Sequence, residues 1–126
     1  MQQLIFENAW ERTISQLDRQ KIENTFEQTK RNTNLLLDLI PLKTATNHRG
    51  ELLVTVLIHN FDEKPFDMST VTIHLLYNKE KVATHTFHEK RLVLDENTSM
   101  PWTFIFPAYS LSGTLAIDNV SLQIAE

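Results

Sequence analysis

At 126 residues the chain has the length of a single domain, and we treat residues 1–126 as one unit. Hydrophobic residues make up 41% of it and charged residues 22%, which is typical of a soluble domain with a packed core. The net charge of −4 argues against nucleic acid as a partner, because phosphate binding needs clustered basic residues.

The chain contains no cysteine, which excludes disulfides, thiolate nucleophiles and zinc–thiolate sites. This absence fits a reducing compartment, although surface proteins of Gram-positive bacteria also commonly lack cysteine. The N-terminus lacks the basic start and apolar core of a secretory signal. No apolar run approaches the roughly 18 residues of a membrane span. We therefore expect no membrane span, and a cytoplasmic protein or the mature part of something larger.

The first 34 residues predict a helical N-terminal segment. Ser15 offers a hydroxyl N-cap three residues before Asp18, and good helix formers continue to Lys30. Ile22 and Phe26 follow at i, i+4 and give a narrow apolar stripe. This stripe either docks a partner protein, together with Trp10, or packs the helix on its own domain. Both interpretations stay open at this stage.

The first predicted strand covers 35–46 and contains Pro41, which cannot donate to a ladder. The strand therefore lies at a sheet edge or carries a bulge there. The next residues, Asn47 to Gly50, predict a type I turn closed by a left-handed glycine, so that Asn47 pairs with Glu51.

The longest apolar run, Glu51 to Phe61, is rich in β-branched residues and predicts a strand covered on both faces. Alternation assigns Leu52, Val54, Val56 and Ile58 to the core. The turn sets the expected cross-strand pairs, which are Ile40 with Ile58, Leu42 with Val56 and Thr44 with Val54.

A second hairpin is predicted after the strand Thr70 to Tyr77. A two-residue loop of Lys79 and Glu80 would need positive φ at both positions, so we favour a three-residue loop with Lys81 in the left-handed region. The expected pairs are Ile73 with Phe87, Leu75 with His85 and Tyr77 with Ala83.

Three further strands complete the prediction. They are Arg91 to Leu94, a strand opened by Pro101 with Trp102, Phe104 and Phe106 on one face, and Val120 to Ile124, which follows a loop over 108–118. Seven short strands at this spacing predict an immunoglobulin-like antiparallel β-sandwich over 35–126, with the α-helix in front of it.

Three histidines are weak candidates for a metal site. In the favoured register His74 and His88 are diagonal neighbours, and in the two-residue-loop register His74 faces His85. A histidine on a half-exposed strand needs no metal to explain it. No Gly-x-Ser-x-Gly motif and no phosphate-binding loop occurs, so we expect no cofactor and no enzymatic activity.

The loop from Asn60 to Met68 carries apolar side chains beside exposed charge. Phe61, Phe66 and Met68 either form a rim that binds a protein partner or seal the end of the β-sandwich.

Several blocks of the sequence resemble one known family. The blocks are AWER at 9–12, IS at 14–15, DRQKIE at 18–23, LIPL at 39–42, NHRGELLVTVLIHNF at 47–61 and TSMPWTFIFP at 98–107. Together they resemble the SLAP domain, from about Trp10 to Pro107. This domain occurs in Bacillus-type proteins described as accessory Sec system S-layer assembly proteins, often twice in tandem.

The resemblance implies a non-enzymatic role in the export or assembly of surface proteins, and it implies no catalytic residues. We expect an interaction module that binds a protein of the export or S-layer machinery, in the cytoplasm at the periphery of that machinery. A self-associating structural domain that forms a homodimer through an edge strand is the alternative. A histidine-based metal-binding protein is a third and weaker hypothesis.

Overall fold

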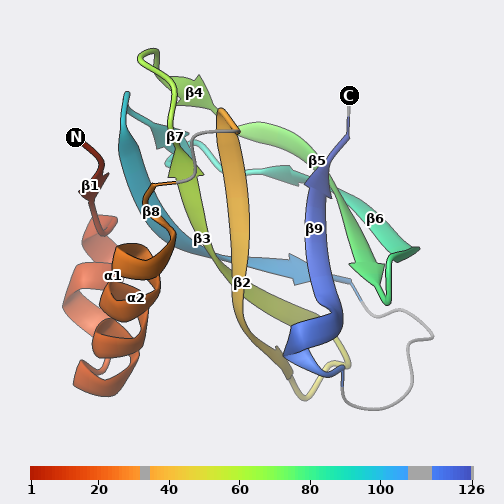
Figure 1. The fold of residues 1–126 in the computed structure, drawn as a ribbon. Coiled ribbons are helices and arrows are strands. Elements are labelled where there is room, and N and C mark those ends of the chain that lie inside the picture. The colour runs from red at the N-terminus through yellow and green to blue at the C-terminus, as the bar shows by residue number, and fades with distance from the viewer. Residues whose placement is uncertain (32–34, 108–114, 126) are drawn as a thin grey trace.

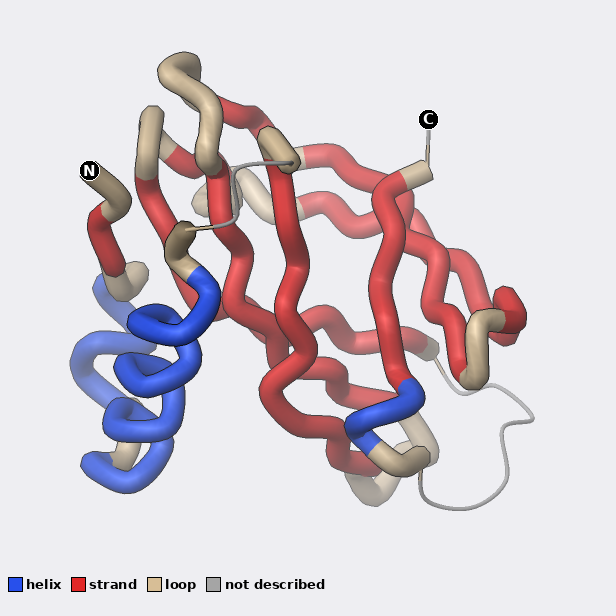
Figure 2. Tube along the Cα trace, viewed as in Figure 1, coloured by secondary structure: helices blue, strands red, loops and turns tan. Residues whose placement is uncertain are grey.

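The computed structural model describes residues 1–31, 35–107 and 115–125, and within them the chain is mainly β with a helical N-terminal segment (Figures 1 and 2). The helices are α1 (Asn8–Thr13), α2 (Gln16–Thr29) and the 3-10 helix η1 (Ile117–Asn119). The strands are β1 (Gln3–Leu4), β2 (Leu37–Thr46), β3 (Leu52–Asn60), β4 (Phe66–Asp67), β5 (Thr70–Tyr77), β6 (Glu80–His88), β7 (Val93–Leu94), β8 (Thr98–Phe106) and β9 (Val120–Ile124).

These strands form a four-stranded sheet in the order β1-β8-β3-β2, a three-stranded sheet in the order β6-β5-β9 and the small pair β4-β7. The described residues hold nine strands where we predicted seven. The two unpredicted strands, β1 and β4, are two residues long, too short to show alternation. Because β1 pairs with β8 in parallel, the four-stranded sheet is mixed and the prediction of a purely antiparallel arrangement was wrong. An immunoglobulin-like topology stays a prediction.

The turn of the first hairpin is confirmed. Gly50 has a φ of 77°, its N–H donates to the Asn47 oxygen at 3.0 Å, and the Asn47 N–H donates to the Glu51 oxygen at 3.1 Å. Glycine has no Cβ, so it adopts this left-handed conformation without strain.

The register beyond this turn was predicted correctly only as far as the bulge. Thr44 pairs with Val54 as expected, but Pro41 pairs with Val56, because a bulge leaves Leu42 as an extra residue. The predicted pairings of Leu42 with Val56 and of Ile40 with Ile58 were therefore wrong. Pro41 was predicted to lie either in an edge strand or at a bulge. Both are true, since β2 is also the outermost strand of its sheet.

The second hairpin differs from its prediction. Its loop is Asn78 and Lys79, with φ values of 53° and 68°, so that Tyr77 pairs with Glu80 rather than with Ala83. Asparagine tolerates the left-handed region, which makes this two-residue turn accessible. A bulge between Leu75 and Leu76 then shifts the register, and the predicted three-residue loop was wrong.

The strand predicted to open at Pro101 in fact begins at Thr98, and the proline lies inside β8 opposite Leu57. Strand β1 pairs with β8 only at Thr98 and Ser99. In the described part of the chain, no second strand pairs with β8 beyond those two residues, so a missing N–H is tolerated there.

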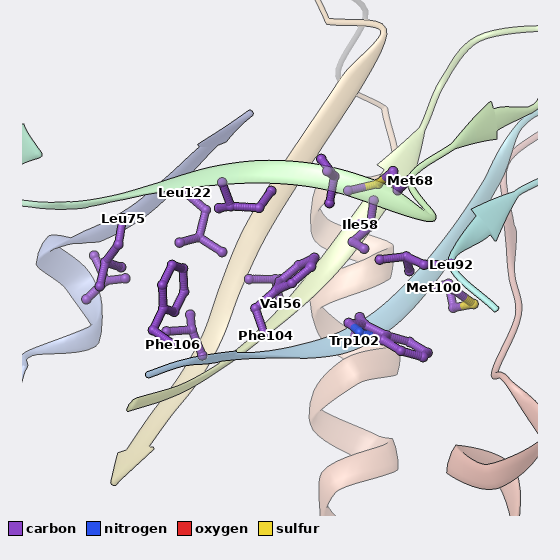
Figure 3. Packing of buried hydrophobic residues seen from close by; sticks show 14 of the residues in the cluster. Val56, Ile58, Met68, Leu75, Leu92, Met100, Trp102, Phe104, Phe106 and Leu122 are labelled. Atoms are coloured by element: carbon purple, nitrogen blue, oxygen red, sulfur yellow. The ribbon is translucent and has the colours of Figure 1, made fainter. Parts of the chain in front are cut away.

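The main core lies between the four-stranded and three-stranded sheets (Figure 3). Its largest fully buried members include Phe104, Phe106, Ile73 and Leu75. Strand β3 contributes Val54, Val56 and Ile58 to this core, as predicted, whereas Leu52 is half-buried at its rim.

The opposite face of β3 is buried as well. There Leu57 packs with Leu42 and with Ile22 and Phe26 of α2, a group that we call the helix-side cluster. Strand β3 is therefore covered on both faces, as its continuous apolar run predicts.

Two helices occur where one was expected. Helix α1 begins at Asn8 and is capped by Glu7, whose carboxylate accepts from the Ala9 N–H at 2.8 Å. Helix α2 begins at the predicted cap, where the Asp18 N–H donates to the Ser15 Oγ at 3.1 Å. Both helices lie on one side of the four-stranded sheet, as Figure 1 shows.

Candidate partner-binding site

The helix stripe singled out in the sequence faces the chain's own sheet. Ile22 is 3% exposed and Phe26 is 8% exposed, and both belong to the helix-side cluster. Lys21 adds a polar contact, since its Nζ donates to the Leu42 oxygen at 2.8 Å. Neither apolar side chain offers its surface to solvent, which agrees with the interpretation that the helix packs on its own domain.

Trp10, the third residue predicted from this segment, lies in a more open place. It is half-buried and packs against both the main core and the helix-side cluster. Trp10 and Trp102 line one groove of about 480 Å³ at the junction of α1 with β8, although they lie far apart in the sequence. We call it the tryptophan groove, and its remaining lining residues are Ala9, Thr13, Ile14, Ser15, Asp18, Arg91 and Thr103.

Arg91 forms the charged border of the tryptophan groove. Its guanidinium lies 5.3 Å from the ring centre of Trp102 and donates to both carboxylate oxygens of Glu89, at 2.9 and 3.0 Å. These hydrogen bonds lower the pKa of Glu89 to about 2. Arg91 also donates to Glu7 at 3.2 Å, which ties it to the carboxylate that caps α1. The groove therefore combines two indole rings with a cation held in place by two carboxylates.

The predicted loop rim is divided between exposed and buried positions. Phe61 is half-buried and stacks on the His59 ring, with 4.8 Å between ring centres. Phe66 is half-buried and pairs with Leu94 in the small sheet, whereas Met68 is fully buried in the main core. Met68 thus seals the domain, and Phe61 and Phe66 keep part of their surface at its rim. Whether any of the six predicted residues contacts a partner stays a prediction.

A buried polar cluster around His59 was not foreseen. The ring is fully buried, with Nε2 at 2.7 Å from the Thr29 Oγ1 and Nδ1 at 2.6 Å from the Ser99 Oγ. Gln2 donates its side-chain N–H to the same Ser99 oxygen at 2.9 Å. This cluster joins α2, β3, β8 and the segment before β1. The sequence signal that could have found it is a histidine inside a strand predicted to be covered on both faces.

The hydrogen bonds around His59 favour a neutral ring. The Thr29 hydroxyl donates to the Thr25 oxygen at 2.7 Å, so its oxygen is left to accept from the His59 Nε2–H. The Ser99 hydroxyl then donates to Nδ1. A proton on Nδ1 would reverse this second bond and deprive the Ser99 hydroxyl of its acceptor. Burial lowers the pKa of His59 from 6.5 to about 4.

The three candidate metal ligands do not adopt either predicted arrangement, in which His74 lies diagonal to His88 or opposite His85. His74 pairs with Thr84 and its Nδ1 lies 2.7 Å from the Thr84 Oγ1, while His85 pairs with Ile73 on the core-facing side. His88 pairs with Thr70, four cross-strand pairs from His74, and its Nδ1 lies 3.4 Å from the Thr70 Oγ1. Among the described residues, no group of three or more histidine, aspartate or glutamate side chains could hold a metal ion.

Together these features define a class of protein, a β-rich domain with a two-helix layer on one sheet and a tryptophan groove beside that layer. The family model of the SLAP domain matches residues 4–125, so the chain belongs to the SLAP domain family. This confirms the resemblance found in the sequence and extends it at both ends. The match covers the chain as one SLAP domain, and the family suggests an S-layer-associated role.

No curated protein and no solved structure matches the chain. Within the described part of the chain, no helix is long and apolar enough to cross a membrane.

Proposed function

We propose that this SLAP domain is a non-enzymatic module that binds an export or cell-surface protein during S-layer assembly or accessory secretion. The observation that carries the proposal is the family match over residues 4–125. We place the protein in the cytoplasm, at the periphery of the secretion machinery, where a partner awaiting export would be met.

The tryptophan groove supports binding rather than catalysis. Tryptophan and arginine are enriched where protein interfaces derive most of their binding energy, because a rigid ring and a planar cation bury much surface at small entropic cost. Here Trp10 is half-buried and Arg91 is exposed beside Trp102. Arg91 is already held by Glu7 and Glu89, so a partner would meet a preorganised surface.

A capture experiment with a matched control tests this proposal. Thr13 is exposed and lines the groove, so Thr13→Arg would fill it without disturbing the core. Gln28→Arg adds the same charge at an exposed position of α2 that does not line the groove. We expect wild type and Gln28→Arg to recover the same export or envelope protein from native cells and Thr13→Arg to lose it. Recovery of no such protein by wild type would count against the proposal.

Self-association through an edge strand is the second candidate. Among the described residues, strand β6 is the outermost strand of the three-stranded sheet and is nine residues long, and a strand at the edge of a sheet is where two copies of a chain can pair. Light scattering over a range of concentrations distinguishes this candidate, because a dimer would appear as concentration rises. A strict monomer at every concentration excludes it.

A further inference from the structure

Within residues 1–31, 35–107 and 115–125, strand β1 is an outer strand of the four-stranded sheet and has no neighbouring strand on its far side, so we call it an open edge. On the side facing β8, the N–H groups of Gln3 and Ile5 donate to the oxygens of Asn97 and Ser99 at 2.9 and 2.8 Å. Successive N–H groups of a strand point to opposite sides, so the N–H and C=O of Leu4 point away from β8. The backbone at this position is oriented to pair with an added strand.

This edge lacks the features that usually protect edges. Charged side chains, proline and bulges normally prevent an edge strand from pairing with another chain. The opposite edge, β2, has Pro41 with its bulge and runs beside β9 (Figure 1). The first six residues, MQQLIF, contain neither a charged side chain nor proline. Ile5, at the centre of the edge, is 48% exposed.

Two grooves flank the edge, and residues of the segment 1–6 that contains β1 line them in alternation. Leu4 and Phe6 line a groove of about 640 Å³ on the helix side. Met1 and Gln3 line a second groove of about 470 Å³ beside the loop before β8, and Ile5 borders both. An extended peptide paired with β1 would place its own alternate side chains in these two grooves, which is the recognition mode of strand addition.

Acidic side chains border both grooves. They are Glu11, Glu23 and Glu27 on the helix side and Asp95 and Glu96 on the loop side. On the helix side Glu11 is paired with Arg19 at 2.8 Å and Glu27 with Lys30 at 2.6 Å, which leaves Glu23 as the lining carboxylate whose charge is not offset by an ion pair within the described residues. On the loop side the lining residues include Asp95 and Glu96 and neither lysine nor arginine. The helix-side groove therefore has an apolar floor of Leu4, Phe6 and Phe26, and carboxylates border both grooves.

We propose that the β1 edge binds an extended, basic segment of a partner protein, which adds to the sheet as a fifth strand. Backbone hydrogen bonds to Leu4 would hold the segment, and lysine or arginine side chains would reach the acidic borders while apolar side chains rest on Leu4 and Ile5. This inference rests on the proposed protein-binding function and names the chemistry of the partner.

The charges disfavour a second copy of this chain at the same edge. Pairing two β1 strands would bring Asp95 and Glu96 of one copy close to the acidic border of the other. Like charges juxtaposed at an interface oppose association, and each copy carries a net charge of −4. A basic segment meets no such repulsion.

Three short capped peptides test the proposal by fluorescence titration or NMR. The first alternates lysine and leucine, the second replaces lysine by glutamate, and the third is the lysine peptide with alternate backbone amides N-methylated. We expect only the first to bind, with affinity that falls as salt is added. N-methylation keeps the charge of the lysine peptide but removes the backbone N–H groups that strand pairing needs. It therefore distinguishes strand addition from nonspecific electrostatic attraction. Equal binding of the first and third peptides would overturn the proposal.

Variants of the protein provide a second test of the proposal. Leu4→Pro removes the outward N–H but leaves the donors of Gln3 and Ile5, so we expect at least about a tenfold loss of peptide affinity. Glu23→Gln should weaken binding less, and Glu80→Gln, at the distant β5–β6 hairpin, should leave it unchanged (Figure 1).

Two other results would overturn the inference. They are absence of binding by wild type at millimolar peptide, and a concentration-dependent dimer that Leu4→Pro abolishes. If Leu4→Pro still recovers an export or envelope protein from cells, the binding function stands and only its assignment to β1 fails.

Discussion

The two faces of the four-stranded sheet are both buried, but they are built from different chemistry. The core-facing side of β3 carries Val54, Val56 and Ile58, which meet apolar side chains of the opposite sheet. The helix-facing side carries Leu57 and, two residues later, His59 with its hydrogen-bonded partners. One strand thus contributes alternately to an apolar core and to a layer that includes a titratable group.

The two sides therefore differ in how their stability responds to pH. The main core depends on apolar burial and shape, which do not respond to pH. The helical layer depends in part on a neutral imidazole that joins Thr29 of α2 to Ser99 of β8. The same serine accepts from Gln2, next to the open edge of β1. The groove lined by Leu4 and Phe6, one of the surfaces proposed for binding, also lies on the helix-facing side.

The largest expected effect is on the core-facing side. Phe104 is 1% exposed and packs with Phe87 at 5.0 Å between ring centres. Phe104→Ala would leave a cavity, and we expect a loss of about 3–5 kcal/mol of unfolding free energy. Denaturant unfolding at neutral pH measures it. A loss below about 1 kcal/mol would mean that the two sheets do not share a packed core.

The second prediction concerns pH and belongs to the helix-facing side. The pKa of His59 is lowered from 6.5 to about 4, so between these values the unfolded chain binds a proton that the folded chain does not. The stability contributed by the neutral ring is complete above pH 6.5 and is lost as pH falls toward 4. The loss approaches about 1.4 kcal/mol per pH unit within this window.

His59→Gln isolates this effect from the titration of carboxylates. We expect the variant to be less stable at pH 7, because the ring packing is lost, but to show a flatter stability profile between pH 6.5 and 4. Urea unfolding of both proteins at several pH values gives the difference. Parallel profiles for wild type and variant would show that His59 is not held neutral.

The smallest expected effect is at the start of α2. The Ser15 Oγ accepts from the Asp18 N–H, so Ser15→Ala should cost about 1 kcal/mol through the loss of the cap. Ser121→Ala, at an exposed position of β9, serves as the control and should change stability by less than about 0.5 kcal/mol. Equal effects of the two substitutions on thermal unfolding would argue against the cap.

The features predicted correctly from the sequence are those encoded by neighbouring residues. The Asn47–Gly50 turn, the Ser15 cap and the buried run of β3 all follow from local chemistry. The second hairpin was mispredicted because the tolerance of Asn78 for positive φ outweighed the preference for a longer loop. A bulge is also invisible to simple alternation, so the register beyond Leu42 failed.

The parts of the candidate site that were missed depend on residues distant in the sequence. Gln2 and Ser99 are 97 positions apart, and no spacing rule brings them together around His59. The same is true of the tryptophan groove, which needs α1 to lie against β8. The two-residue strand β1 gave no periodic signal, so its edge appeared only with the folded structure.

Residue-resolved amide hydrogen exchange of the first six residues tests the central claim most directly. We expect the amides of Gln3 and Ile5 to be protected by β8 and the Leu4 amide to exchange fast in the free protein. Adding the lysine–leucine peptide should slow exchange at Leu4, while its N-methylated form should not. A Leu4 amide already protected in the free protein, or unchanged by the peptide, would contradict the claim that β1 is a binding edge.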